Sequence, residues 1–246
     1  MSSSAKRSRP ARRSRRRQVV VSCEHGGNRV PPEYAPLFAG AADVLATHRG
    51  YDSGALEVAR AFARRLGVTP FTSTTTRLVV DLNRSPRNRN VFSAYTRVLS
   101  AEQRAAALAA HYRPYRDAVE NAVAGALRGG AAVLHVSAHS FTPVLRGEVR
   151  RCDVGFLYDP RQPAEVELVE AWYAELRAAA PELVLRRNYP YRGVSDALVT
   201  HLRRRYGARG YAGMELEVNQ RHVGSRHWRA LVAALAATLR AALERI

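Results

Sequence analysis

Two histidines follow short apolar runs that are typical of buried strands. His25 comes just after Val19-Val20-Val21, and His139 comes just after a predicted strand over 131–136. Binding sites in open α/β sheets lie at the carboxyl ends of the strands, where these two imidazoles would meet. Two imidazoles with nearby acids suit a catalytic zinc, which takes three protein N/O ligands and keeps a fourth position for water. We therefore expect one zinc ion (Zn2+) bound by His25 and His139.

The third zinc ligand is open between Asn28 and Glu24. Glu24 offers a carboxylate, but it neighbours His25 on an extended backbone, where successive side chains diverge. Asn28 has the better reach, although its neutral amide is a weaker ligand. We favour Asn28 as the third ligand.

An acidic cluster lies in 214–220, where polar and apolar residues alternate. This period of two places Glu215, Glu217 and Asn219 on one face of a strand. A carboxylate beside a metal can take a proton from the attacking water and return it to the leaving amine. We predict that Glu217 is the general base, with Glu215 as the second choice.

A further polar group surrounds Leu78-Val79-Val80, a run that the β-branched pattern predicts as a strand. The group consists of Arg77, Asp81, Asn83 and Arg84. A guanidinium can grip a substrate carboxylate in bidentate fashion, and an Asp can hold that Arg in place. The alternative is a salt-bridged surface loop.

Predicted strands alternate with predicted helices along the chain, which indicates an α/β sheet flanked on both faces. One helix covers 55–66 and stops at Gly67, a residue type typical of helix ends. Ser100 caps the next helix. The other expected elements are helices over 100–127, 163–180, 195–206 and 225–245, and strands over 153–157, 183–186 and 212–218. We expect one catalytic domain over 18–246.

The formal net charge of +18 belongs partly to the N-terminus, where eight basic residues among the first seventeen leave +10 for the remainder. Residues 1–17 contain almost no apolar side chain, so we expect a disordered basic tail. A nucleic-acid-binding protein acting through residues 6–17 is the competing interpretation, and its affinity would fall steeply with salt. The tail lacks interleaved aromatic residues, which disfavours that interpretation.

Two cysteines, Cys23 and Cys152, are far apart and form no CxxC pair. Neither a disulfide framework nor a thiolate zinc site is therefore indicated. No stretch approaches the roughly 20 apolar residues needed to cross a bilayer, and the run after the arginines becomes polar too soon for a signal peptide. We expect a cytoplasmic protein with no membrane partner, and the sequence leaves the oligomeric state open.

Several motifs, in order along the chain, resemble those of the N-formylglutamate amidohydrolase family. They lie at 23–31, 48–55, 77–85, 135–143, 153–159, 188–193 and 215–220, and the resemblance covers about residues 18–223. It implies a zinc carboxypeptidase-like fold, which is a three-layer αβα arrangement with a central mixed, mainly parallel sheet. The implied activity is metal-dependent hydrolysis of a small N-acyl amino acid such as N-formylglutamate.

The resemblance also implies a role for each matching residue. His25 and His139 become zinc ligands, Asn83 and Arg84 the substrate-carboxylate grip, Arg77 a helper that polarises the scissile carbonyl, and Glu217 the general base. Asp52, Tyr191 and Arg192 are implied to line the pocket.

The chain departs from the pattern of related enzymes at two positions. The His-x-x-Glu pattern reads His25-Gly26-Gly27-Asn28, which puts the third ligand in question. The common Asp-x-His-Ser pattern reads Ser137-Ala138-His139-Ser140, which removes a carboxylate that would orient the histidine.

Two other functions compete within this resemblance. A zinc carboxypeptidase or amidase would act on a larger peptide or cell-wall amide, and the loops over 85–100 and 141–152 would decide pocket size. A non-catalytic family member is motivated by Asn28 and Ser137, while an intact Glu217 argues against it.

Overall fold

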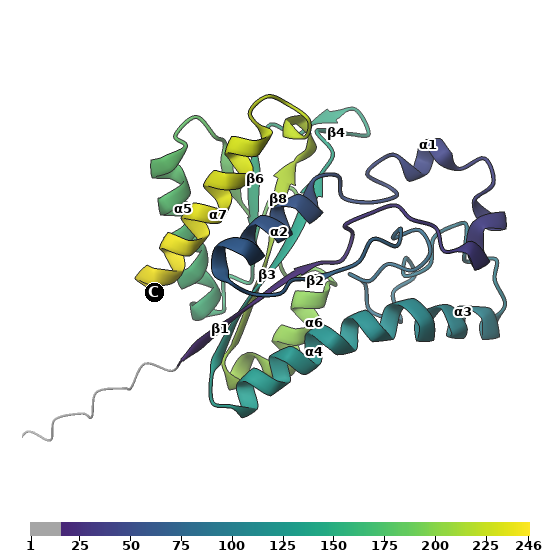
Figure 1. The fold of residues 1–246 in the computed structure, drawn as a ribbon, viewed down its shortest axis with the longest axis horizontal. Helices are drawn as coiled ribbons and strands as arrows, with labels where there is room; N and C mark the ends of the chain where they lie inside the picture. The colour runs from purple at the N-terminus through teal and green to yellow at the C-terminus, as the bar shows by residue number, and fades with distance from the viewer. Residues whose placement is uncertain (1–15) are drawn as a thin grey trace, which may run out of the picture.

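The computed structural model describes residues 16–246, and its centre is a six-stranded sheet with helices on both faces (Figure 1). The strand order is β2-β1-β3-β8-β6-β7, and every neighbouring pair is parallel except β6 with β8. The strands are β1 (Arg17–Cys23), β2 (Phe71–Thr72), β3 (Ala132–Phe141), β6 (Val154–Leu157), β7 (Leu185–Arg187) and β8 (Tyr211–Asn219). The predicted three-layer αβα fold with a mixed, mainly parallel sheet is confirmed.

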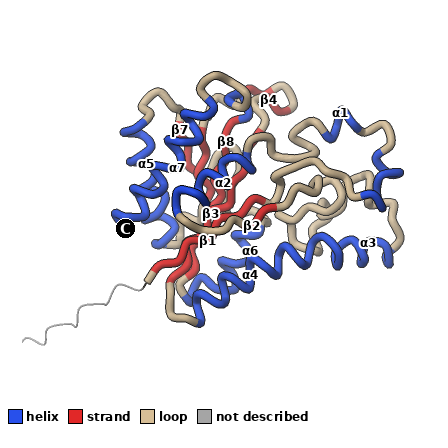
Figure 2. The backbone as a smooth tube through the Cα atoms, in the orientation of Figure 1, coloured by secondary structure: helices blue, strands red, loops and turns tan. Residues whose placement is uncertain are grey.

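Helices pack against the sheet in two groups, as Figure 2 shows. One group is α2 (Ala55–Leu66), α5 (Pro163–Ala179) and α7 (Trp228–Arg245), and the other is α4 (Arg113–Arg128) with α6 (Leu198–Tyr206). Successive strand residues point to opposite faces, so Val21 packs in the core under the first group and Val20 in the core under the second. Both faces of β1 are therefore buried.

The helix predicted from Ser100 is present but contains a π-helical segment. It runs as α3 (Ala101–Ala107), a π segment over Leu108–Tyr112, and then α4. Ser100 caps it as predicted, because its Oγ accepts a 3.2 Å hydrogen bond from the Gln103 backbone N–H. The Gln103 side chain in turn accepts from the Ser100 backbone N–H at 2.9 Å, which completes a capping box.

Leu78-Val79-Val80 is not a strand, so that prediction was wrong. These residues lie in turns, and the Val79 N–H donates to the Thr76 carbonyl at 3.1 Å. They are buried in a separate core with residues such as Tyr34, Val91 and Tyr112, in a loop-rich lobe beside the sheet. The apolar run Leu78-Val79-Val80 therefore packs the core of this lobe and does not join the sheet. The edge strand beside β1 is β2. The lobe also contains a 3-10 helix (Pro32–Phe38) and α1 (Ala42–Leu45).

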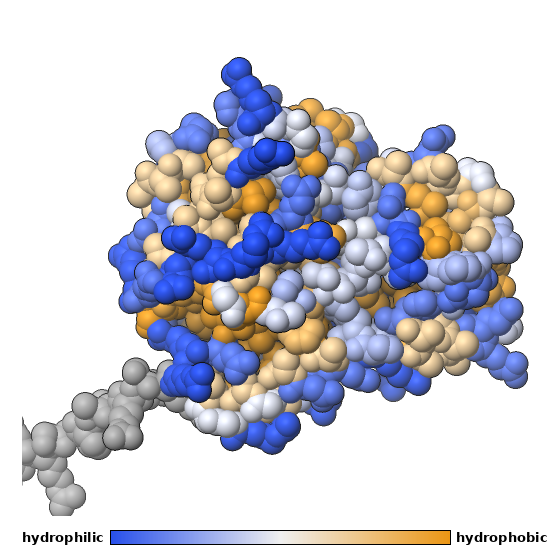
Figure 3. Space-filling view, viewed as in Figure 1, coloured by the Kyte–Doolittle hydropathy of each residue, from blue (hydrophilic) through white to orange (hydrophobic). Residues whose placement is uncertain are grey.

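A short hairpin and the chain surface complete the description. The hairpin is formed by β4 (Val144–Leu145) and β5 (Glu148–Val149). Hydrophilic side chains cover much of the face seen in Figure 3, with smaller hydrophobic areas between them. No helix within 16–246 is long and apolar enough to cross a membrane. Residues 1–15 of the predicted tail lie outside the described residues, and β1 already begins at Arg17.

Candidate metal centre and active-site cavity

The carboxyl ends of β1, β3 and β8 meet at one edge of the sheet. In the register of these parallel strands, Ser137 lies opposite Ser22 and Glu215, and His139 lies opposite Glu217. A cavity of about 200 Å3 opens at this edge. The predicted site residues that line it are His25, Asp52, Arg77, Asn83, Arg84, His139, Tyr191, Arg192, Glu215 and Glu217, whereas Asn28, Glu24 and Asp81 do not.

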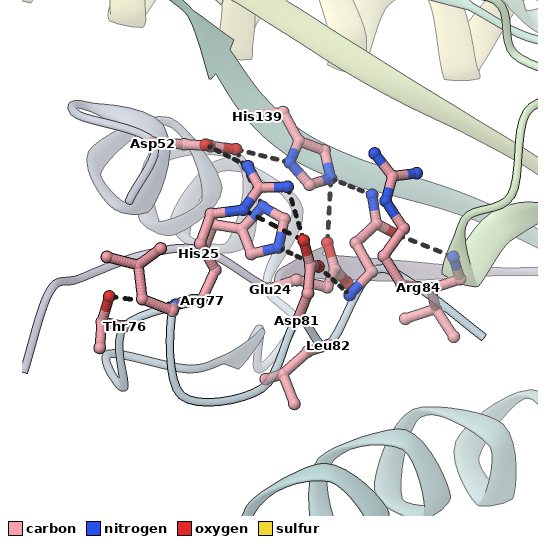
Figure 4. Close-up of polar contacts among 12 residues, drawn as sticks. Glu24, His25, Asp52, Thr76, Arg77, Asp81, Leu82, Arg84 and His139 are labelled. Carbon is pink, nitrogen blue, oxygen red and sulfur yellow. Dashed lines mark hydrogen bonds and ion pairs between the residues drawn. The ribbon is translucent and has the colours of Figure 1, made fainter. Parts of the chain in front are cut away.

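Both histidines direct Nδ1 at one carboxylate oxygen, as Figure 4 shows. The Nδ1 atom of His25 lies 3.2 Å from Oδ2 of Asp52, and the Nδ1 atom of His139 lies 2.8 Å from the same oxygen. The centroids of the two rings are 5.3 Å apart. Two imidazole nitrogens and a carboxylate oxygen thus converge.

The opposite nitrogen of each ring, Nε2, faces a different acid. Nε2 of His25 lies 2.8 Å from Oδ1 of Asp81, and Nε2 of His139 lies 3.1 Å from Oε2 of Glu24 and 2.9 Å from Oγ of Ser137. A histidine that donates its Nε2 proton to a carboxylate keeps a lone pair on Nδ1 and a fixed ring orientation. Related enzymes have an Asp where this chain has Ser137, and here the carboxylate of Glu24 takes the role of orienting His139.

These contacts leave His25, Asp52 and His139 as a compact set of possible metal ligands. One ligand atom from each lies within 4.8 Å of the others, and all three residues are buried. Two imidazoles and one carboxylate match the donor set of catalytic zinc sites with three protein ligands. The residues present therefore fit a single zinc ion.

Negative charge concentrates around the two rings. Burial opposes ionisation of Asp52, but the charge of His25 and the hydrogen bond from His139 outweigh it and hold the pKa of this carboxyl well below its usual range. Burial also opposes ionisation of Glu24, and its hydrogen bond with His139 lowers that pKa too. The pKa of His139 is raised despite burial, because Asp52 and Glu24 accept its hydrogen bonds. A divalent cation would balance these carboxylates.

Glu217 lies in the same cavity, and no side-chain partner for it is present within 16–246. Among the described residues its buried Oε2 atom accepts no hydrogen bond. Burial raises the pKa of Glu217 to about 8, and the nearby Asp52 carboxylate adds to the rise. Glu215 instead accepts a 2.7 Å hydrogen bond from Nδ2 of Asn83 and lies 3.5 Å from Nε2 of His139. Of the two acids, Glu217 has the uncommitted oxygen.

A family model of N-formylglutamate amidohydrolases matches residues 17–223. The chain belongs to the N-formylglutamate amidohydrolase family. This match spans every residue assigned to the cavity above, and it confirms the resemblance seen in the sequence motifs. The family and the fold make the protein an amidohydrolase.

Two solved structures share the fold of this chain. A gene product of Agrobacterium tumefaciens is 29% identical, with a TM-score of 0.80, over 92% of this chain and 90% of that chain. An N-formylglutamate amidohydrolase from Ralstonia eutropha JMP134 is 21% identical, with a TM-score of 0.71, over 94% of this chain and 95% of that chain, and it shows the same fold. Among curated proteins no match was found.

Asn28 is not placed near the metal ligands of this amidohydrolase, which corrects its prediction as the third ligand. Its side chain is exposed and donates to the Leu45 carbonyl at 3.1 Å. The backbone turns away from the cavity after His25, because the Gly26 N–H donates to the Ser73 carbonyl at 2.9 Å. Asp52, expected only to line the pocket, is the third member of the possible ligand set with His25 and His139.

Arg77 bridges Asp52, which lines the cavity, and Asp81 behind it. Its Nη1 lies 3.2 Å from Oδ1 of Asp52, and its Nη2 lies 2.8 Å from Oδ2 of Asp81. Burial opposes its charge, but these two carboxylates raise the pKa of the guanidinium further above its usual range. The expected pairing of an Asp with an Arg is present, with Arg77 as the partner. Its predicted contact with a scissile carbonyl stays a prediction.

Asn83 and Arg84 line the cavity, but both have protein partners. Asn83 donates to Glu215 and accepts a 2.7 Å hydrogen bond from the Leu198 backbone N–H, so both ends of its amide are engaged. An Nη1 proton of Arg84 goes to the Asp196 carbonyl. Asn83 is therefore better placed to hold Glu215 than to bind a substrate, whereas Arg84 keeps further N–H donors for a ligand.

Tyr191 and Arg192 form the outer wall. Tyr191 is 43% exposed, and its hydroxyl accepts a 3.0 Å hydrogen bond from Nη1 of Arg150. Arg192 is exposed, and its guanidinium has no hydrogen-bond or ion-pair partner within 16–246. Arg192 is thus a cation available to an anionic ligand.

The sequence analysis did not predict how three carboxylates hold the two histidine rings. The carboxylate of Asp81 holds Nε2 of His25, Glu24 holds Nε2 of His139, and Asp52 joins the two rings. Asp52 and Asp81 lie in loops, so no strand or helix period marks them. The acidic residues inside the recognised motifs were the available signal.

Proposed function

We propose that this amidohydrolase is zinc-dependent and cleaves the amide of an N-acyl amino acid, with N-formyl-L-glutamate as the first candidate. The observation that carries the proposal is the convergence of His25 Nδ1 and His139 Nδ1 on Asp52, beside an unpartnered carboxylate oxygen of Glu217. His25, Asp52 and His139 would hold the zinc. The bound ion supplies Lewis acidity, which polarises a carbonyl and lowers the pKa of water.

The proton transfers fall to Glu217. Within 16–246 no donor occupies its buried Oε2 atom, which leaves this oxygen free to exchange a proton with water. Glu217 would accept a proton from the attacking water at this oxygen and deliver it to the leaving nitrogen. The products are a carboxylate, which is formate for a formyl substrate, and a free amino acid.

Substrate recognition would rest on two arginines that line the cavity. Arg192 and Arg84 present guanidinium donors to the cavity, and guanidinium groups bind carboxylates in bidentate fashion. An N-acyl amino acid always carries an α-carboxylate, so it offers the matching anion. The cavity volume of about 200 Å3 is below the roughly 300–1,000 Å3 of pockets that bind drug-sized ligands, which favours a small substrate.

Formate release from N-formyl-L-glutamate tests the proposal, measured with zinc-loaded wild type and with Glu217→Gln. The wild type should release formate, and the variant should bind zinc but lose activity by about a hundredfold or more, because general base catalysis contributes 10²–10⁴-fold. Full activity in Glu217→Gln would refute the assigned base. Zinc binding without hydrolysis of any N-formyl amino acid would refute the substrate class.

A further inference from the structure

The π segment and the first turn of α4 together present three polar side chains to the rear of the site. Tyr112 ends the π segment, and Tyr115 and Arg116 lie in the first turn of α4. Their spacing of three and four residues places them on one helix face. None of the three is among the described residues that line the cavity, so they act on it through other side chains.

Tyr115 contacts the acid that orients His139. Its hydroxyl donates to Oε1 of Glu24 at 3.0 Å, while Oε2 of the same carboxylate accepts from Oγ of Ser137 at 2.5 Å and lies 3.1 Å from Nε2 of His139. The Tyr115 hydroxyl also lies 3.2 Å from the Phe71 carbonyl oxygen. A phenol has one proton, and the charged acceptor makes the stronger hydrogen bond. Each oxygen of Glu24 is therefore held by a donor.

The other two side chains hold a different part of the site. The Tyr112 hydroxyl donates to the Arg84 carbonyl at 2.7 Å, and Nη1 of Arg116 donates to the Leu82 carbonyl at 3.1 Å. These bonds fix the loop that carries Arg84, and neither of them reaches Glu24. Two tyrosines on one helix face thus serve separate elements.

We propose that Tyr115 is a positioning residue for the metal centre, which through Glu24 fixes the direction in which His139 presents Nδ1. This inference rests on the proposed zinc site. Partners that orient a metal-bound histidine typically change metal affinity by about 10–100-fold when they are removed. Tyr115 contacts Glu24 and not the histidine itself, so its loss should have the smaller effect and weaken zinc binding by about tenfold.

The test compares Tyr115→Phe with the matched variant Tyr112→Phe in the full chain. Zinc dissociation constants are measured by competition with a chelator, and visible absorption spectra are recorded with Co2+ in place of zinc. Tyr115→Phe should bind zinc about tenfold more weakly and alter the Co2+ spectrum. Tyr112→Phe should leave the zinc dissociation constant and the Co2+ spectrum unchanged within experimental error. It should raise only the KM for substrate, because Tyr112 holds the loop that carries Arg84. Similar thermal unfolding of the metal-free variants would exclude a general loss of structure.

A double variant adds a second measurement. Because Tyr115 acts through Glu24, Tyr115→Phe combined with Glu24→Gln should bind zinc as weakly as Glu24→Gln alone. Wild-type affinity in Tyr115→Phe, equal weakening in both tyrosine variants, or additive losses in the double variant would each overturn the inference. A wild type that binds no zinc would overturn the metal centre itself, a result separate from these three.

Discussion

Glu217 is the residue whose environment most directly affects chemistry. Its pKa is raised from 4.5 to about 8 in the folded protein, so the folded state binds more protons than the unfolded state between these values. The protonated carboxyl stabilises the fold below about pH 4.5, and this contribution is lost as the pH rises through about 8.

Metal-free wild type should therefore lose stability relative to Glu217→Gln as the pH rises from 5 to 9. The amide stays neutral throughout, whereas the buried carboxyl must ionise without a partner for its Oε2 atom. Urea unfolding of both proteins at several pH values measures the difference in the free energy of unfolding. A difference that is independent of pH would show that Glu217 has an ordinary pKa.

Arg192 supplies a prediction about substrate binding. Because its guanidinium has no partner within 16–246, Arg192→Ala should leave the fold intact and raise the KM for N-formyl-L-glutamate. A hydrogen bond between charged groups is worth about 1.5–3 kcal/mol, which corresponds to about 10–100-fold. Steady-state kinetics measures the change, and Arg161→Ala, whose exposed guanidinium pairs with Asp159, is the control. Equal KM values in the two variants would remove Arg192 from the substrate site.

Some of these roles follow from sequence patterns and others depend on three-dimensional contacts. His25, His139 and Glu217 could be placed because strand ends and a period of two locate side chains on a sheet. The role of Glu24 could not be predicted in this way. Glu24 lies in the turn that follows β1, where the period of two no longer applies, and its Oε2 atom lies 3.1 Å from Nε2 of His139 on the neighbouring strand.

At the scale of elements, β6 and the segment that follows β7 approach each other closely. A Cβ atom at Gly155 would lie 2.0 Å from the Tyr189 carbonyl oxygen. The segment that contains Tyr189 also carries Arg192, so the absence of a side chain at Gly155 lets the outer wall reach the cavity.

Gly155→Ala should displace this segment, destabilise the protein by about 1–3 kcal/mol and raise KM. The matched change is Gly207→Ala, where the nearest atoms to a new Cβ are 3.9 Å away. Thermal unfolding and steady-state kinetics on the two variants give the comparison. Wild-type behaviour of Gly155→Ala would show that the contact tolerates a methyl group.

Element boundaries were predictable where caps and periodicity coincide. The helix over Ala55–Leu66 was predicted at both ends, because apolar residues recur at helical spacing and Gly67 adopts a left-handed φ of 68°. The run Leu78-Val79-Val80 misled because burial alone does not distinguish a strand from turns packed in a lobe. Its partners, such as Tyr34 and Tyr112, are distant in the sequence and gave no local signal.

On the scale of the whole molecule, the sheet brings together groups from the N-terminal, middle and C-terminal parts of the chain. Basic residues outnumber acidic ones by 39 to 21 and give a net charge of +18. The cavity nevertheless contains the carboxyl groups of Asp52, Glu215 and Glu217. A net positive surface potential attracts anionic ligands, while the buried carboxylates suit a metal ion.

Zinc content of the purified protein tests the central claim most directly, measured in wild type, Asp52→Ala and Asn28→Ala. We predict about one zinc per chain in the wild type, loss of zinc in Asp52→Ala, and full retention in Asn28→Ala. Zinc retained by Asp52→Ala but lost from Asn28→Ala, or no zinc in the wild type, would contradict a metal centre of His25, Asp52 and His139.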